Sequence, residues 1–267
     1  MSSISSAQRA ITFLKSIQPN GPWCVAALDP DRKVGPKSEV FYPGQEANFE
    51  AFFEHWNGTR GLYYQVNLVK PKEQWKGKGK AEKSDIAVVI GAHVDIDIES
   101  DLQPINKQMD MILGELERLN PTHYIMSGGG WQAICQYTTP VVLTGDPRQV
   151  EELEAANEAL IARLDGDPAC KDISRLLRLP FTWNIPGEKK KTTKPWRTTV
   201  ESYWLNEGKP GPTFDVGFVT PLEPGQRVDR RKQSKRKAKH QVDVGTNFAT
   251  PPPVNSQEDI ATSSKMT

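Results

Sequence analysis

Residues 92–99 read Ala92-His93-Val94-Asp95-Ile96-Asp97-Ile98-Glu99 and directly follow an apolar run from Ile86 to Ile90. The apolar run predicts a buried strand, where an unpaired carboxylate is costly. Alternate residues of a strand point to the same side, so we expect Asp95 and Asp97 to project together. Two adjacent carboxylates repel each other unless a cation joins them, and Mg²⁺ prefers oxygen ligands. Alone, the pattern predicts either a metal site or a strand end with two solvated acids.

The bulk composition bounds the size and the setting of the protein. The chain has 267 residues and a formal net charge of +1, which allows one substantial domain with an appendage or two small domains. Its cysteines lie far apart and show neither zinc-ligand spacing nor a disulfide framework: Cys24, Cys135 and Cys170. We therefore expect a reduced, intracellular protein of the cytoplasm. There is no signal-peptide pattern and no apolar run of membrane-spanning length, so no membrane partner is expected.

The periodicity along the chain predicts a mixture of helices and strands in irregular order, which favours an α+β domain over a doubly wound parallel sheet. Helices are expected at 5–17, 46–56, 105–119 and about 147–164, strands at 22–28, 61–68, 86–97, 122–126 and 130–142, and a short helix or strand at 173–179. The Lys/Gly-rich segment 70–83 is expected to be a mobile loop. Residues 1–209 are expected to form the folded domain, and residues 210–267 a disordered tail that is basic and contains prolines.

A glycine-rich turn joins two of the expected strands. It reads Ser127-Gly128-Gly129-Gly130-Trp131-Gln132. Three successive glycines let backbone amides approach a ligand closely, and such amides can form a concavity that binds anions. The Ser127 hydroxyl and the Gln132 amide would add polar groups. The alternative is a flexible hairpin without a ligand.

A later segment, 166–180, brings further charged residues into an apolar stretch and reads GDPACKDISRLLRLP. Asp172 either caps the short element that follows or pairs locally with Arg175. Arg178 lies between Leu177 and Leu179, and a guanidinium among core residues generally pairs with an acid or a phosphate.

The three motifs in this order resemble the archaeo-eukaryotic primase superfamily. The likeness is greatest to the RepB-like primase and primase-polymerase domains of plasmids, phages and mobile elements, and it runs from about Pro22 to about Asn184. It includes the strand Gly61-Leu62-Tyr63-Tyr64-Gln65-Val66-Asn67, which typically precedes the acidic motif. The resemblance implies an α+β catalytic core with an RNA-recognition-like antiparallel sheet and flanking helices.

The resemblance also implies roles for single residues. Asp95, Asp97 and a third acid would be catalytic and would bind Mg²⁺ or Mn²⁺; Asp167 is favoured as the third acid and Asp172 is the alternative. The incoming nucleoside triphosphate would be bound by Ser127, Gly128, Gly129, Gly130, Gln132 and Arg178. The implied activity is two-metal, template-directed primer synthesis by a DNA nucleotidyltransferase in the replication of a plasmid, phage or mobile element.

Partners follow from the same resemblance. The template would be single-stranded DNA, held by the basic clusters 70–83, 189–197 and 227–239. Ordinary solubilising charge in loops is the alternative, and for any single cluster taken alone it is the favoured one. No Walker-type phosphate loop is present, so a replicative helicase would be a separate protein.

Two residues depart from the usual pattern: Gln132 where many members carry histidine, and Phe181 where glycine is usual. They favour an alternative, a catalytically weak or inactive primase-like replication protein that binds DNA or a replication partner. A third possibility is metal-dependent nuclease or untemplated nucleotidyl-transfer chemistry, which an Asp-x-Asp pair alone permits.

Overall fold

The acidic strand is β5, Ile86–Asp97, and it lies inside an antiparallel sheet of the computed structural model, which describes residues 4–77, 79–98, 104–193 and 199–219. Within these described residues the sheet has five strands in the order β11-β6-β7-β5-β4. The other four are β4 (Leu68–Val69), β6 (His123–Met126), β7 (Gly130–Val142) and β11 (Tyr203–Trp204).

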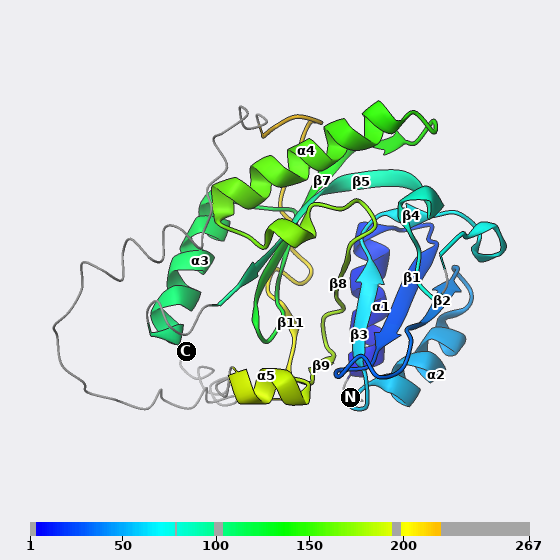
Figure 1. The fold of residues 1–267 in the computed structure, drawn as a ribbon, viewed down its shortest axis with the longest axis vertical. Helices are drawn as coiled ribbons and strands as arrows, with labels where there is room; N and C mark the ends of the chain where they lie inside the picture. The colour runs from blue at the N-terminus through cyan, green and yellow to red at the C-terminus, as the bar shows by residue number, and fades with distance from the viewer. Residues whose placement is uncertain (1–3, 78, 99–103, 194–198, 220–267) are drawn as a thin grey trace, which may run out of the picture. The chain divides into compact units, whose positions relative to one another are not determined.

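Two helices belong to this sheet: α3 (Ile105–Leu119) and α4 (Pro147–Leu164). Along the chain β5, α3, β6, β7 and α4 follow one another as β-α-β-β-α, and β7 lies between β5 and β6. This is the strand order expected of an RNA-recognition-like sheet. Helix α4 crosses β5 and β7 on one side of the sheet (Figure 1).

A second antiparallel sheet has the order β2-β1-β3-β8 among the described residues. Its strands are β1 (Trp23–Leu28), β2 (Lys37–Phe41), β3 (Gly61–Gln65) and β8 (Leu176–Arg178), and it is accompanied by helices α1 (Ser6–Ile17) and α2 (Glu46–Trp56). The remaining elements are β9 (Trp183–Asn184), which pairs with β10 (Val200–Glu201), helix α5 (Glu188–Thr193), and three 3₁₀ turns, η1 (Lys72–Gln74), η2 (Lys83–Asp85) and η3 (Pro168–Cys170).

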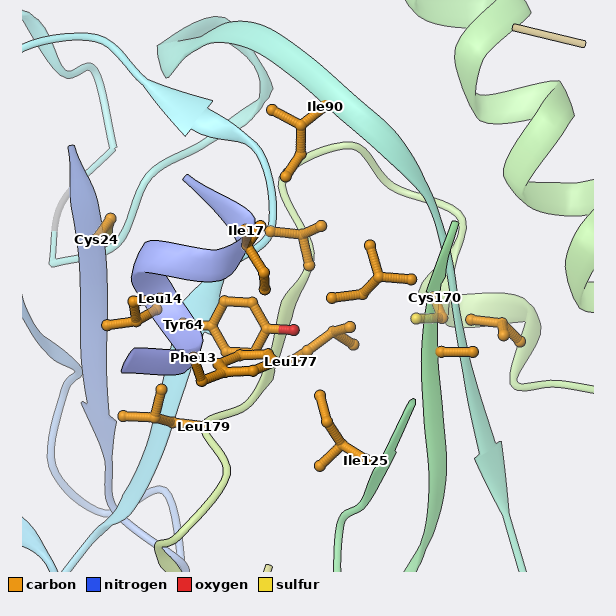
Figure 2. Packing of buried hydrophobic residues seen from close by; sticks show 14 of the residues in the cluster. Phe13, Leu14, Ile17, Cys24, Tyr64, Ile90, Ile125, Cys170, Leu177 and Leu179 are labelled. Carbon is orange, nitrogen blue, oxygen red and sulfur yellow. The ribbon is translucent and has the colours of Figure 1, made fainter. Parts of the chain in front are cut away.

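The two sheets enclose one hydrophobic core with α1 between them. Figure 2 shows the ring of Tyr64 from β3 at its centre, with Ile125 from β6 on the side of the first sheet. Phe13 of α1 meets Tyr64 edge to face, with 5.2 Å between the ring centroids. Leu177 and Leu179 are fully buried on either side of Arg178. The core thus fixes β8 against the sheet that carries the acids.

The ends of the helices follow from local sequence. Ser5 and Gln8 form a capping box at the start of α1, and Asp146 accepts a hydrogen bond from the Arg148 amide at the start of α4. Helices α3 and α4 end at Asn120 and Asp165, both in the left-handed conformation that these short polar residues tolerate.

Most expected elements are confirmed, including the α+β class and the helices at 46–56 and 105–119. The segment expected to be a mobile loop instead contains η1, and η2 begins at its last residue, Lys83. Ala81 within the segment is buried. The described structure also continues past the expected boundary at residue 209, because Phe214 exchanges backbone hydrogen bonds with Gln136 and Thr138 of β7. Residues 220–267, the larger part of the expected tail, lie outside the described residues.

In the described part of the chain, no helix is long and apolar enough to cross a membrane. All three cysteines are free thiols and buried.

Candidate functional site

Asp95 and Asp97 lie at the end of β5, where the strand leaves the core. Val94 and Ile96 are fully buried, whereas the two aspartates are partly exposed, as expected for alternating residues. Asp95 is opposite Gln132 on β7, and Asp97 is opposite Gly130 in the glycine turn. The acidic motif and the glycine turn are therefore brought together by strand pairing.

The surroundings of Asp95 disfavour its negative charge. Burial, followed by the charge of Asp97, raises the pKa of Asp95 to about 6. Arg175 and a hydrogen bond from Gln132 act in the opposite direction, and Asp167 adds to the rise. Asp97 and Asp167 thus oppose ionisation of Asp95, whereas Arg175 and Gln132 favour it.

Asp167 is held beside Asp95 by the backbone. Its amide donates to the Asp95 carbonyl over 2.7 Å. The preceding Gly166 makes this approach possible, because a Cβ there would lie 2.4 Å from Val94 Cγ2 and 3.0 Å from the Asp95 carbonyl oxygen. The Asp167 carboxylate accepts a hydrogen bond from the Ala169 amide and forms an ion pair of 3.5 Å with Arg175.

Asp172 points to different partners. Its carboxylate accepts from the Ser174 amide and hydroxyl, over 2.8 and 2.7 Å, and pairs with Lys83 over 3.4 Å. Burial alone would raise the pKa of Asp172, but Ser174 and Lys83 outweigh it and lower the pKa. The expected local pairing of Arg175 with Asp172 is replaced by its pairing with Asp167. Asp167 thus lies beside Asp95, whereas the Asp172 carboxylate is engaged by Ser174 and Lys83.

The glycine turn is packed rather than open. The Ser127 amide and hydroxyl both donate to the Gly130 carbonyl, over 2.9 and 3.1 Å. Gly128 has a φ of +80°, and a Cβ there would lie 2.9 Å from Asn184 Cβ and 3.0 Å from Val200 Cγ1. The turn therefore touches the β9–β10 pair, and glycine is required for that contact.

Arg178 is nearly buried, and its guanidinium joins three strands. It donates to Tyr63 Oη over 2.7 Å, to Asn184 Oδ1 over 2.8 Å and to the Trp183 carbonyl over 3.4 Å, and it lies 4.3 Å from the centre of the Tyr63 ring. Sequence reasoning missed the roles of Tyr63 and Asn184. Asn184 stands at the end of the stretch that resembles primases and could have been noticed there, whereas only the pairing of β3 with β8 reveals Tyr63.

Gln132 connects the acids to Arg178. Its Nε2 donates to Asp95 Oδ1 over 3.4 Å, and its Oε1 accepts from the Arg178 amide over 3.0 Å. The side chain is 3% exposed. One buried residue thus bridges the two sheets at the site.

The donor chemistry of this site fits Mg²⁺ or Mn²⁺, although the ligands are not assembled. Asp95 and Asp97 offer hard oxygen donors on one face of β5, and the charge of Asp97 contributes to the raised pKa of Asp95. Among the described residues, no three Asp, Glu, His or Cys side chains converge closely enough to hold a metal ion. The Asp167 carboxylate would have to turn from Ala169 and Arg175 to complete the set.

Comparison with known proteins identifies the fold. No family model matches the sequence, and no curated protein matches it. The structure is similar to the archaeo-eukaryotic primase domain of the cyanophage S-2L primase-polymerase, with a TM-score of 0.51 and 16% identity, and the match covers 78% of this chain and 93% of that chain. It is also similar to the primase RepB′, with a TM-score of 0.50 and 15% identity, covering 88% of this chain and 67% of that chain. The fold predicted from the sequence motifs is thereby confirmed.

Proposed function

We propose that this domain is the catalytic core of a DNA primase or primase-polymerase that joins nucleotides on a single-stranded DNA template. The observation that carries the proposal is the convergence of Asp95 and Asp97 at one strand end, with Asp167 bound to the same strand, in a fold shared with primase domains. Nucleotidyl transfer by two metal ions requires such carboxylates around a shared site.

In this proposal Asp95, Asp97 and Asp167 hold Mg²⁺ or Mn²⁺. When bound, these ions favour attack by a 3′-hydroxyl and stabilise the pyrophosphate that leaves. Arg178 faces the triphosphate, and Tyr63 and Asn184 hold its guanidinium in place. A guanidinium carries five N–H donors, and the contacts within the described structure use three of them. Gly128 of the glycine turn packs against Asn184, and in this proposal Ser127 and the glycines contact the same triphosphate.

The single-stranded template would be held by its phosphates. The lysines of 70–77 and 79–83 and those of α5 would supply these contacts, which weaken as salt rises. A replicative helicase is a further partner in this proposal.

The test is primer synthesis and extension on single-stranded DNA with Mn²⁺. We expect Asp95→Ala and Asp97→Ala to lower the rate by at least about a hundredfold, because each removes a metal ligand. Asp167→Asn and Asp172→Asn form a matched pair: the first should abolish extension, and the second should retain most of it. Equal activity of wild type and the double variant Asp95→Ala/Asp97→Ala would reject the catalytic assignment. Loss of activity in Asp172→Asn but not in Asp167→Asn would identify Asp172, and not Asp167, as the third acid.

A second function is a primase-like replication protein that binds DNA or a partner without catalysis. It is favoured by the Asp167 carboxylate being turned to Ala169 and Arg175, and by the use of both polar ends of Gln132 inside the protein. Calorimetry with Mn²⁺ and a nucleoside triphosphate separates the two functions. Intact DNA binding without metal-dependent nucleotide binding would favour the second.

A further inference from the structure

Gln132 occupies an unusual place between the two sheets. It belongs to β7 and is paired with Asp95. Its side-chain oxygen, Oε1, nevertheless accepts a hydrogen bond from the backbone of β8 in the other sheet. Both polar ends of the side chain have partners of the matching kind: the NH₂ faces a carboxylate, and the oxygen faces an amide N–H. If the side-chain amide of Gln132 were flipped, its oxygen would face the Asp95 carboxylate and its NH₂ would face the Arg178 N–H. Neither pair can form a hydrogen bond, so these two partners fix the orientation of the amide.

The backbone of β8 explains why a partner is needed there. The Leu179 amide donates to Leu62 of β3, so the Arg178 amide points out of the other edge of the strand. That edge is buried, and a buried N–H without a partner costs free energy. The Gln132 oxygen takes the place that a neighbouring strand would otherwise fill.

The same contacts couple two parts of the proposed site. One end of Gln132 orients Asp95, and the other fixes the backbone of the residue whose guanidinium is held by Tyr63 and Asn184. Movement of β8 relative to β7 would therefore disturb Asp95 and Arg178 together.

We propose that Gln132 is a positioning residue that holds the metal-binding carboxylate and the Arg178 strand in register, and that it does not itself contact the nucleotide. This inference rests on the proposed function for the identity of the site. It deepens that function by separating Gln132 from the groups that bind triphosphate.

Three variants test the inference. Gln132→Met keeps the length of the side chain and removes both hydrogen bonds, whereas Gln132→Glu keeps the acceptor for the Arg178 amide. Gln136→Met is the matched control, because Gln136 lies on the same face of β7 and joins Ile17 and His123 at a distance from the acids. The full chain is used throughout.

Two measurements are made on each variant. Hydrogen exchange in metal-free protein should show faster exchange of the Arg178 amide in Gln132→Met but not in Gln132→Glu. Free Mn²⁺, followed by electron paramagnetic resonance, should show binding weakened about tenfold in Gln132→Met, which corresponds to about 1.4 kcal/mol, and unchanged in Gln136→Met. At saturating Mn²⁺, the affinity of Gln132→Met for a deoxynucleoside triphosphate should stay within about twofold of wild type.

Either of two results would overturn the inference. One is unchanged exchange of the Arg178 amide in Gln132→Met. The other is unchanged Mn²⁺ binding with about tenfold weaker nucleotide binding, which would make Gln132 a nucleotide contact. Failure of the proposed function is distinguishable from failure of this inference, because wild type itself would then neither bind Mn²⁺ nor extend a primer. The exchange of the Arg178 amide would still decide whether Gln132 holds β8. If Gln132→Met does not fold, Gln132→Glu decides: retained protection of the Arg178 amide supports the inference, and its loss contradicts it.

Discussion

Phe181 carries a backbone conformation suited to glycine. Its φ is +65°, its side chain is fully buried, and the Arg9 guanidinium lies 3.9 Å from the centre of its ring. The Phe181 backbone amide donates a hydrogen bond to the Ser202 carbonyl, which holds the backbone of this turn in place. The phenylalanine thus occupies a position where the sequence resemblance places glycine and retains a glycine-like backbone. Its burial offsets a strain of about 1 kcal/mol.

This arrangement predicts that glycine at position 181 gives a more stable protein than alanine does, which is the reverse of the usual order. Phe181→Ala loses the buried ring and retains the strained backbone, so we expect a cost of about 3–5 kcal/mol. Phe181→Gly loses the same ring but relieves the strain, and it should be about 1 kcal/mol more stable than the alanine variant. Urea unfolding of the three proteins measures both differences. An alanine variant more stable than the glycine variant would show that the left-handed backbone carries no strain.

At the scale of elements, Asp85 organises the segment 70–85. Its carboxylate accepts hydrogen bonds from the amides of Lys76, Gly77 and Glu82, over 2.7, 3.0 and 2.8 Å. Burial alone would raise the pKa of Asp85, but these amides outweigh it and lower the pKa. A buried carboxylate with three backbone donors turns a Lys/Gly-rich sequence into a defined structure.

Asp85→Ala should therefore release this segment. We expect a loss of about 3 kcal/mol at pH 7 and faster amide exchange across 70–85, since hydrogen bonds to a charged group are among the stronger ones. Because the folded pKa is lowered, the contribution of Asp85 is present above pH about 4 and is lost as the pH falls through the folded pKa. Glu73→Ala, an exposed acid in the same segment, is the control and should change neither quantity. An equal effect of the two substitutions would refute the role of Asp85.

The elements also show where sequence reasoning succeeds and where it fails. The helix at 105–119 and the glycine turn were predicted because periodicity and turn chemistry are local. The structure of the segment 70–85 was not predicted, because it depends on one aspartate that accepts hydrogen bonds from backbone amides up to nine positions away. The partners of Arg178 were missed for a similar reason: Tyr63 is 115 positions distant, and only the pairing of strands brings it near. The acids were predicted, whereas the turning of Asp167 toward Arg175 depends on packing that the sequence does not display.

At the scale of the whole molecule, the buried histidines and the partly exposed Asp95 give opposite dependences of stability on pH. Burial lowers the pKa of both His93 and His123 to about 4, so the unfolded chain takes up these protons first and stability falls as the pH drops from about 6.5 to about 4. Asp95 has a raised pKa, so its contribution is present below pH about 4 and is lost as the pH rises through about 6. The two effects overlap in one pH window and partly cancel in the wild type.

Substitution of single acids separates these effects. Without metal, Asp95→Asn should stabilise the protein at pH 7 by about 1–2 kcal/mol, because it removes a disfavoured charge from a partly exposed site. The gain should vanish near pH 4, where the wild-type carboxyl is protonated. Asp172→Asn is the matched control with the opposite sign: its pKa is lowered by Ser174 and Lys83, so the variant should lose stability at pH 7 and approach wild type below pH about 4. Denaturant unfolding at several pH values measures all three proteins. Destabilisation of metal-free Asp95→Asn at neutral pH would mean that the acidic strand end stabilises the fold, which would remove the electrostatic case for a cation there.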